Sequence, residues 1–227
     1  MSSPPGRRGA SDTSSSTPSP SNWSTTGGPP NTRASGQAAW PISRPESKAV
    51  QKWRKLKVPE TTQVFRIFIR GSVEEVWREI TKTDEPIACF FNSRMDVSAL
   101  RPGSKLAMRT PNNAYTGVVG EILEVRPYQR FSHSFRFTHL NEPASKVIYD
   151  LEQVEGGVEF TLTIEDLPIG TKSAKQMVQG GTMIVNTLKK VIETGRPSLG
   201  TRALFAFFRA TQPFTPNKCR TEHWPVD

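Results

Sequence analysis

The feature that most constrains the fold is a run of short alternating segments followed by one long amphipathic helix. Five segments between residues 104 and 167 alternate apolar and polar residues with the period of two that is typical of β-strands. Turn sequences such as PNNA and EGG separate them, and links this short favour antiparallel hairpins. From about Lys172 to Thr194, apolar residues recur every three to four positions, until Gly195 and Pro197 end the pattern. We therefore expect an α+β fold in which the long helix packs on an antiparallel sheet.

Upstream of this run, the sequence predicts one strand and two short helices. The segment TTQVFRIFIRGS alternates apolar and polar residues and predicts a strand. In SVEEVWREIT, Ser72 stands three residues before Glu75, which is the pattern of a capping box at a helix start. The apolar stripe of this helix consists of Val73, Val76, Trp77 and Ile80. The segment DEPIACFFNS, with Asp84 as N-cap, predicts the second short helix.

Composition divides the chain into three parts. Residues 1–58 are rich in Ser, Thr, Pro and Gly and end in the basic run KWRKLK, so we expect a disordered tail and a basic linker. Two other interpretations of this tail stay open. It is either an organelle transit peptide or the result of a translation start assigned too far upstream. Residues 59–196 form the expected folded domain. Residues 197–227 form an extension with a short apolar helix, which we expect to pack on the domain and close one end of a cavity; a membrane surface or a protein partner is the alternative contact.

Charge and cysteine usage limit the classes of partner. The net charge is +9, but the basic residues are spread along the chain, and no nucleic-acid-binding motif is present, so we predict no specific nucleic-acid partner. No apolar run approaches the roughly 20 residues of a membrane span, and no secretory signal is recognisable. Cys89 and Cys219 lie far apart without metal-ligand spacing. We therefore predict a cytoplasmic protein with two free thiols, no transmembrane segment, no metal and no cofactor.

The segment RFSHSFRFTH contains two of the three histidines. Its alternation places Phe131, His133, Phe135, Phe137 and His139 on one face of a strand. Six residues of strand separate the two histidines by roughly 20 Å, which is too far for one metal ion or one proton relay. His133 is therefore interpreted as part of an apolar wall, where it is either a satisfied core histidine or a polar anchor for a ligand. His139 is expected at the rim.

Several phrases, taken in order, resemble the family of activator of heat-shock-protein-90 ATPase homologue-like proteins. They are SVEEVWREIT, RPGSKLAM, YTGVVGEILEVRPYQRFSHSF, VIYDLEQVEGGVEFTLTIEDL and LKKVIETG, and they cover about residues 61 to 196. The resemblance implies a helix-grip fold, in which a curved antiparallel sheet wraps the long C-terminal helix. The wider group with this fold includes polyketide cyclases, steroidogenic-acute-regulatory lipid-transfer domains and the birch-pollen allergen. The phrases are structural rather than catalytic, so they imply little about chemistry.

Two departures from the family bear on function. Gly180-Gly181 stands where the family often has Gly-Trp, which would leave more room between helix and sheet. The tail is too poor in apolar residues to be the separate N-terminal domain of relatives that activate the chaperone. The poor tail counts against a co-chaperone role. The pattern alone leaves a filled core and an open cavity as alternatives, and the glycine pair favours a cavity between the sheet and the long helix. The expected lining residues are Trp77, Met108, Phe131, His133, Phe135, Phe137, Tyr149, Leu151, Phe160, Leu162, Met177, Gly181, Ile184 and Leu188.

The expected function is binding of a small hydrophobic or aromatic ligand in this cavity without catalysis. The alternative is a cyclase- or dehydratase-like enzyme that uses His133 as its acid or base, with Tyr149 and Glu121 as helpers. No nucleophile elbow, metal spacing or phosphate-binding loop supports that alternative. A third hypothesis is a stress or chaperone-accessory module that binds a protein partner through the aromatic C-terminal segment.

Overall fold

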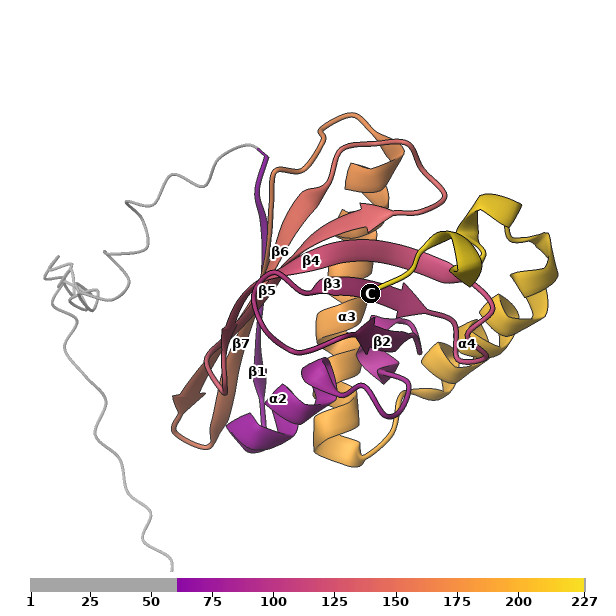
Figure 1. Ribbon diagram of the computed structural model, residues 1–227. Helices are drawn as coiled ribbons and strands as arrows, with labels where there is room; N and C mark the ends of the chain where they lie inside the picture. Colours follow the sequence, from indigo (N-terminus) through magenta and orange to yellow (C-terminus); the bar gives the residue numbers. More distant parts are fainter. Residues whose placement is uncertain (1–60, 227) are drawn as a thin grey trace, which may run out of the picture. The chain divides into compact units, whose positions relative to one another are not determined.

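The computed structural model describes residues 61–226, and Figure 1 shows them as a curved sheet with helices against it. Within this range the chain forms seven strands that pair into one antiparallel sheet. Their bounds are Gln63–Ile69 (β1), Arg94–Val97 (β2), Lys105–Arg109 (β3), Thr116–Arg126 (β4), Arg130–Phe137 (β5), Ser145–Val154 (β6) and Gly157–Glu165 (β7). The strand order is β1-β7-β6-β5-β4-β3-β2. The predicted tail, residues 1–58, lies outside the described residues.

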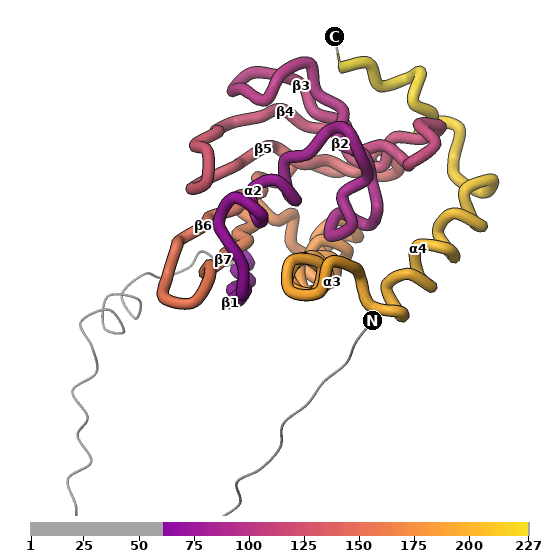
Figure 2. The backbone as a smooth tube through the Cα atoms, turned by 90° about the horizontal axis from the view of Figure 1, so that it is seen from below, coloured from indigo at the N-terminus to yellow at the C-terminus, as the bar shows by residue number. Residues whose placement is uncertain are grey.

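Helix α3, Lys172–Thr194, has the bounds that the sequence predicts. The Thr171 side chain caps its start by accepting a hydrogen bond from the Ala174 N–H, and Gly195 ends it with a φ of 72°. Figure 2 looks along α3 and shows the sheet curving around it. The predicted α+β architecture and the helix-grip arrangement are therefore confirmed.

Helix α2, Val73–Thr81, begins at the predicted capping box. The Ser72 hydroxyl accepts a hydrogen bond from the Glu75 N–H, and the Glu75 carboxylate accepts one from the Ser72 N–H. The predicted stripe is buried at Val76, Trp77 and Ile80. Helix α2 contacts both β6 and α3, so it seals one end of the space between the sheet and α3.

Two elements after α2 differ from the prediction. The expected second helix is a single 3-10 turn, Ala88–Phe90 (η1), which follows Ile87 and is not capped by Asp84. Phe91 and Asn92 come next with φ values of 57° and 59°, so the backbone turns instead of continuing as a helix. Strand β2 then follows, which the sequence does not predict because four residues are too few to display an alternation.

The C-terminal extension consists of helix α4, Leu199–Thr211, and three 3-10 turns. The turns are Gln212–Phe214 (η2), Asn217–Cys219 (η3) and Thr221–His223 (η4). Helix α4 has no buried residue. The chain after it is anchored, because Arg109 Nη2 donates a hydrogen bond to the Trp224 carbonyl at 3.1 Å and the Thr221 N–H donates to the Ala114 carbonyl at 3.1 Å. Among residues 61–226, no helix is both long and apolar enough to cross a membrane.

Candidate functional site

An apolar cavity of about 640 Å³ lies between the concave face of the sheet and the N-terminal half of α3. Residues of β3 to β7, η1 and α3 line it, together with one residue of α4. Its polar side chains are Ser93, His133, His139, Tyr149, Gln176 and Gln179. None of the described residues that line it is Asp, Glu, Lys or Arg. Binding sites for small molecules have volumes of about 300 to 1,000 Å³. The volume of this hollow, which we call the inner cavity, lies within that range.

The structure brings together eight of the fourteen predicted lining residues at the inner cavity. These are Met108, His133, Phe135, Phe137, Tyr149, Leu162, Met177 and Ile184. The other six are buried in the packed core away from the hollow: Trp77, Phe131, Leu151, Phe160, Gly181 and Leu188. For Gly181 the reason is direct, because a Cβ at this position would lie 2.3 Å from Cε2 of Phe65. The expectation of open room at Gly181 is therefore wrong, since the Phe65 ring occupies that space.

His133 is held in one tautomer by the backbone. Its Nδ1 lies 2.8 Å from the Ser134 carbonyl oxygen, which can only accept, so Nδ1 carries the hydrogen. Gly120 leaves room for that carbonyl, because a Cβ at residue 120 would lie 1.8 Å from the Ser134 oxygen. Burial lowers the pKa of His133 to about 4, so the ring is neutral at pH 7. Its other nitrogen, Nε2, is buried without a hydrogen-bond partner among the described residues.

Aromatic rings surround His133 on the inner face of the sheet. Its ring centroid lies 5.5 Å from that of Phe131, 5.9 Å from that of Tyr149 and 6.4 Å from that of Phe135. Burial raises the pKa of Tyr149, so its hydroxyl keeps its proton. The two polar-tipped residues of the predicted wall are therefore neighbours, and both line the inner cavity.

The other residues expected near His133 lie elsewhere. Glu121 is exposed and lines a separate depression of about 420 Å³ beside Trp224, so the prediction that it helps His133 is wrong. His139 follows the end of β5 and also lines the inner cavity, with its ring 5.2 Å from that of Phe137. Burial lowers its pKa, against an opposing contribution from the Gln176 side chain. Among the described residues, no hydrogen bond or ring contact joins the two histidines.

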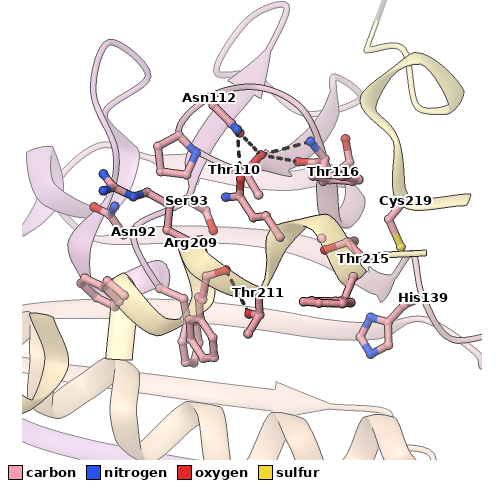
Figure 3. A pocket seen from close by; sticks show the side chains of 18 of the residues that line it. Asn92, Ser93, Thr110, Asn112, Thr116, His139, Arg209, Thr211, Thr215 and Cys219 are labelled. Carbon is pink, nitrogen blue, oxygen red and sulfur yellow. Dashed lines mark hydrogen bonds between the residues drawn. The ribbon is translucent and has the colours of Figure 1, made fainter. Parts of the chain in front are cut away.

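A second hollow of about 1,060 Å³, which we call the outer groove, is lined by α4 and by the turn between β3 and β4; Figure 3 shows Arg209 and Thr211 of the helix together with Thr110 and Asn112 of the turn. In this turn the Thr110 hydroxyl donates to Asn112 Oδ1 at 2.8 Å. Asn112 Nδ2 in turn donates to Gln212 Oε1 at 2.9 Å, which ties this turn to the end of α4. Five residues line both hollows: Phe91, Ser93, Gly117, His139 and Phe208. The inner cavity and the outer groove therefore adjoin at the point where Phe208 of α4 meets the domain.

Metal ligands and cysteine thiols are two further kinds of reactive group to consider among the described residues. Among residues 61–226, no group of three or more His, Cys, Asp or Glu side chains could hold a metal ion. Cys89 and Cys219 are buried free thiols, and burial raises the pKa of Cys89. The Cys89 thiol is therefore a weak nucleophile at neutral pH.

The sequence matches the family described as Activator of Hsp90 ATPase homolog 1-like protein over residues 70–193. The chain belongs to this family. The match begins directly after β1 and stops one residue before the end of α3, so it spans nearly all the elements that build the inner cavity. Helix α4 lies outside the family match, and so does the rest of the C-terminal extension.

No curated protein matches the chain. Solved structures do match it, and three of them share 16 to 19% identity with it. A protein from Mesorhizobium loti is 17% identical over 58% of this chain and 96% of its own, with a TM-score of 0.50. An HSP90 activator from Plasmodium falciparum is 16% identical over 60% of this chain and 98% of its own, with a TM-score of 0.49. The Aha1 dimer from Colwellia psychrerythraea is 19% identical over 59% of this chain and 97% of its own, with a TM-score of 0.48. Likeness at these identities concerns the fold alone.

Sequence reasoning missed several residues that line the inner cavity in this member of the Activator of Hsp90 ATPase homolog 1-like family. They are Phe90, Phe91, Ser93, Gly117, Val118, Gln176, Gln179, Gly180, Met183 and Phe208. Helical spacing could have found part of the set, because Gln176, Gly180 and Met183 flank the predicted Met177 and Ile184 on one face of α3. Phe208 belongs to the apolar helix that the sequence predicts to close one end of the cavity, but the local pattern does not indicate which residue of this helix reaches the lining.

Proposed function

We propose that this protein binds a small hydrophobic or aromatic molecule in the inner cavity and does not catalyse a reaction on it. The observation that carries this proposal is an apolar hollow of about 640 Å³ with no acidic or basic side chain among its described lining residues. Burial of apolar surface contributes a free energy of about 25 cal/mol per Å². Contact of an apolar ligand with side chains such as Phe135, Phe137 and Ile184 would therefore stabilise the complex. The family match is compatible with ligand binding and with a role beside the chaperone. We place the protein in the cytoplasm, where its free thiols would stay reduced.

The titration behaviour of the cavity residues favours binding over proton transfer. An efficient acid or base has a pKa near the working pH, whereas burial lowers the pKa of His133 to about 4 and raises that of Tyr149. At pH 7, His133 is a weak base and Tyr149 is a weak acid. Both suit the task of orienting a ligand by hydrogen bonds.

Native mass spectrometry of the protein purified gently from its source cells tests the proposal. We expect a retained mass of small-molecule size that is released on unfolding. A clean ligand-free mass, with no shift after incubation with lipids and aromatic compounds, would overturn the proposal.

A variant that fills the inner cavity provides the matched control. Gly180 lines the cavity, so Gly180→Phe should abolish the retained mass. Val178 lies two residues away on the same helix, is 36% exposed and does not line the cavity, so Val178→Phe should retain the ligand. Equal retention by the two variants would mean that the ligand sits elsewhere.

Binding to the chaperone Hsp90 is a second candidate function, and α4 and η2 give it a surface. Phe207 is 61% exposed with its ring 6.2 Å from that of Phe208, and Phe214 is 86% exposed, so this segment offers several apolar rings to a partner. The test is the ATPase rate of Hsp90 with and without this protein. Stimulation that Phe207→Ser and Phe214→Ser remove would support this function, and an unchanged ATPase rate would reject it.

A further inference from the structure

His133 provides the inner cavity with a hydrogen-bond acceptor whose role is set by the backbone. Because Nδ1 donates to the Ser134 carbonyl at 2.8 Å, the neutral ring keeps its lone pair on Nε2. That nitrogen is buried and has no partner among the described residues, although the His133 ring lines the cavity. A buried acceptor without a partner costs free energy, so a ligand that donates a hydrogen bond to it would remove this cost.

The rest of the inner cavity is unsuited to a charged ligand. No Asp, Glu, Lys or Arg is among the described residues that line it, so a buried charge would lack a counter-ion. A carboxylate would also place its oxygens against the lone pair of His133. Burial opposes protonation of this ring, so His133 does not become the missing cation at pH 7.

We propose that the ligand of the inner cavity is an uncharged apolar molecule with a hydroxyl or N–H group, and that this group donates its hydrogen to Nε2 of His133. The inference rests on the proposed function and adds the chemical class of the ligand. It ranks hydroxylated ring compounds above their ethers, and both above carboxylates such as fatty acids. Tyr149 also lines the inner cavity, and its hydroxyl can donate to a second polar atom of the same ligand.

Matched probes on two ring skeletons test the inference at pH 7 by calorimetric titration. They are 2-naphthol, 2-methoxynaphthalene and 2-naphthoate, together with 7-hydroxyflavone and 7-methoxyflavone. We expect each hydroxyl compound to bind about 3- to 10-fold more tightly than its methyl ether, which is the range of one net hydrogen bond. We expect the naphthoate to bind more weakly still, by a further factor of about 10 or more.

The His133→Phe variant separates the hydrogen bond from the shape of the site. Phe keeps a ring against Phe131, Phe135 and Tyr149 but has no acceptor. The preference for hydroxyl over ether should vanish in this variant, while binding of the ethers persists. His133→Gln, which can present an oxygen to the cavity, should restore part of the preference.

Two results would overturn the inference and leave the proposed function standing. One is equal binding of hydroxyl and ether probes, with no effect of His133→Phe. The other is recovery of a hydrocarbon, an ether or an acid as the ligand that the purified protein retains. Absence of binding by both skeletons, combined with a clean ligand-free mass, would instead overturn the proposed function itself, and the inference with it.

Discussion

The two ends of the space between the sheet and α3 are built from similar side chains but are filled differently. At the packed end, which we define by Phe131, Phe160 and Leu188, all three side chains are completely buried. At the hollow end, defined by Phe135 and Ile184, comparable side chains are only partly buried and face the inner cavity. Helix α2 seals the packed end, whereas α4 stands at the hollow end without a single buried residue. The cavity therefore results from the second layer of helices and not from a shortage of large apolar residues.

The largest effect expected from this comparison is on stability, and two positions one turn apart on α3 measure it. Leu188→Ala should lower the free energy of unfolding by about 2 to 5 kcal/mol, because it leaves a cavity in a closed core. Ile184→Ala should cost roughly half as much or less, because its side chain already borders a hollow. Chemical denaturation of both variants checks the pair. Equal losses would mean that the hollow end is filled in solution.

His133 lies at the boundary between the two ends and gives the protein a pH dependence. Its folded pKa of about 4 is below the ordinary value of 6.5, so the unfolded chain binds this proton first as the pH falls. The associated stability is fully present above pH 6.5 and is lost between pH 6.5 and 4, by about 3 kcal/mol. Unfolding measured from pH 7 to 4.5 should show a shallower slope for His133→Phe than for the native chain. Parallel slopes would show that His133 is accessible to protons in the folded state.

The sequence predicts which residues face the space between the sheet and α3, but not which end of that space is packed and which is hollow. Period-two alternation correctly placed Phe131 and Phe135 on the same inner face, and helical spacing located the bounds of α3. Nothing in the local pattern distinguishes these two phenylalanines, because the difference comes from α2 and α4, which are remote in sequence. Gly181 was misplaced for the same reason, since its neighbour Phe65 lies on the first strand, more than one hundred residues earlier.

Substitution of the adjacent glycines Gly180 and Gly181 in α3 tests the same difference in packing, with smaller expected changes in stability. Gly181→Ala should destabilise the protein by about 1 to 2 kcal/mol, because its Cβ would lie 2.3 Å from the Phe65 ring and force it to move. Gly180→Ala should stabilise it by up to roughly 1 kcal/mol, because its Cβ would meet the Phe91 ring at 3.5 Å, an ordinary contact, and alanine favours a helix. Thermal unfolding distinguishes the two signs. Stabilisation by both substitutions would mean that Phe65 adapts without cost.

The smallest expected effect concerns α4. Two consecutive phenylalanines of this helix, Phe207 and Phe208, allow it to be measured with a matched control. Phe208 lines both hollows, with its ring 6.4 Å from that of Phe91, whereas Phe207 lines neither and is 61% exposed. With 7-hydroxyflavone as the probe, Phe208→Ala should speed ligand dissociation about 3- to 10-fold, and Phe207→Ala should leave it unchanged. Neither variant should change the unfolding free energy by more than about 1 kcal/mol, because α4 buries no residue. Stopped-flow displacement measures the rates. If 7-hydroxyflavone dissociates from Phe208→Ala at the native rate, α4 is not a wall of the inner cavity. The hollow end must then be closed by η1 and the β3–β4 turn instead.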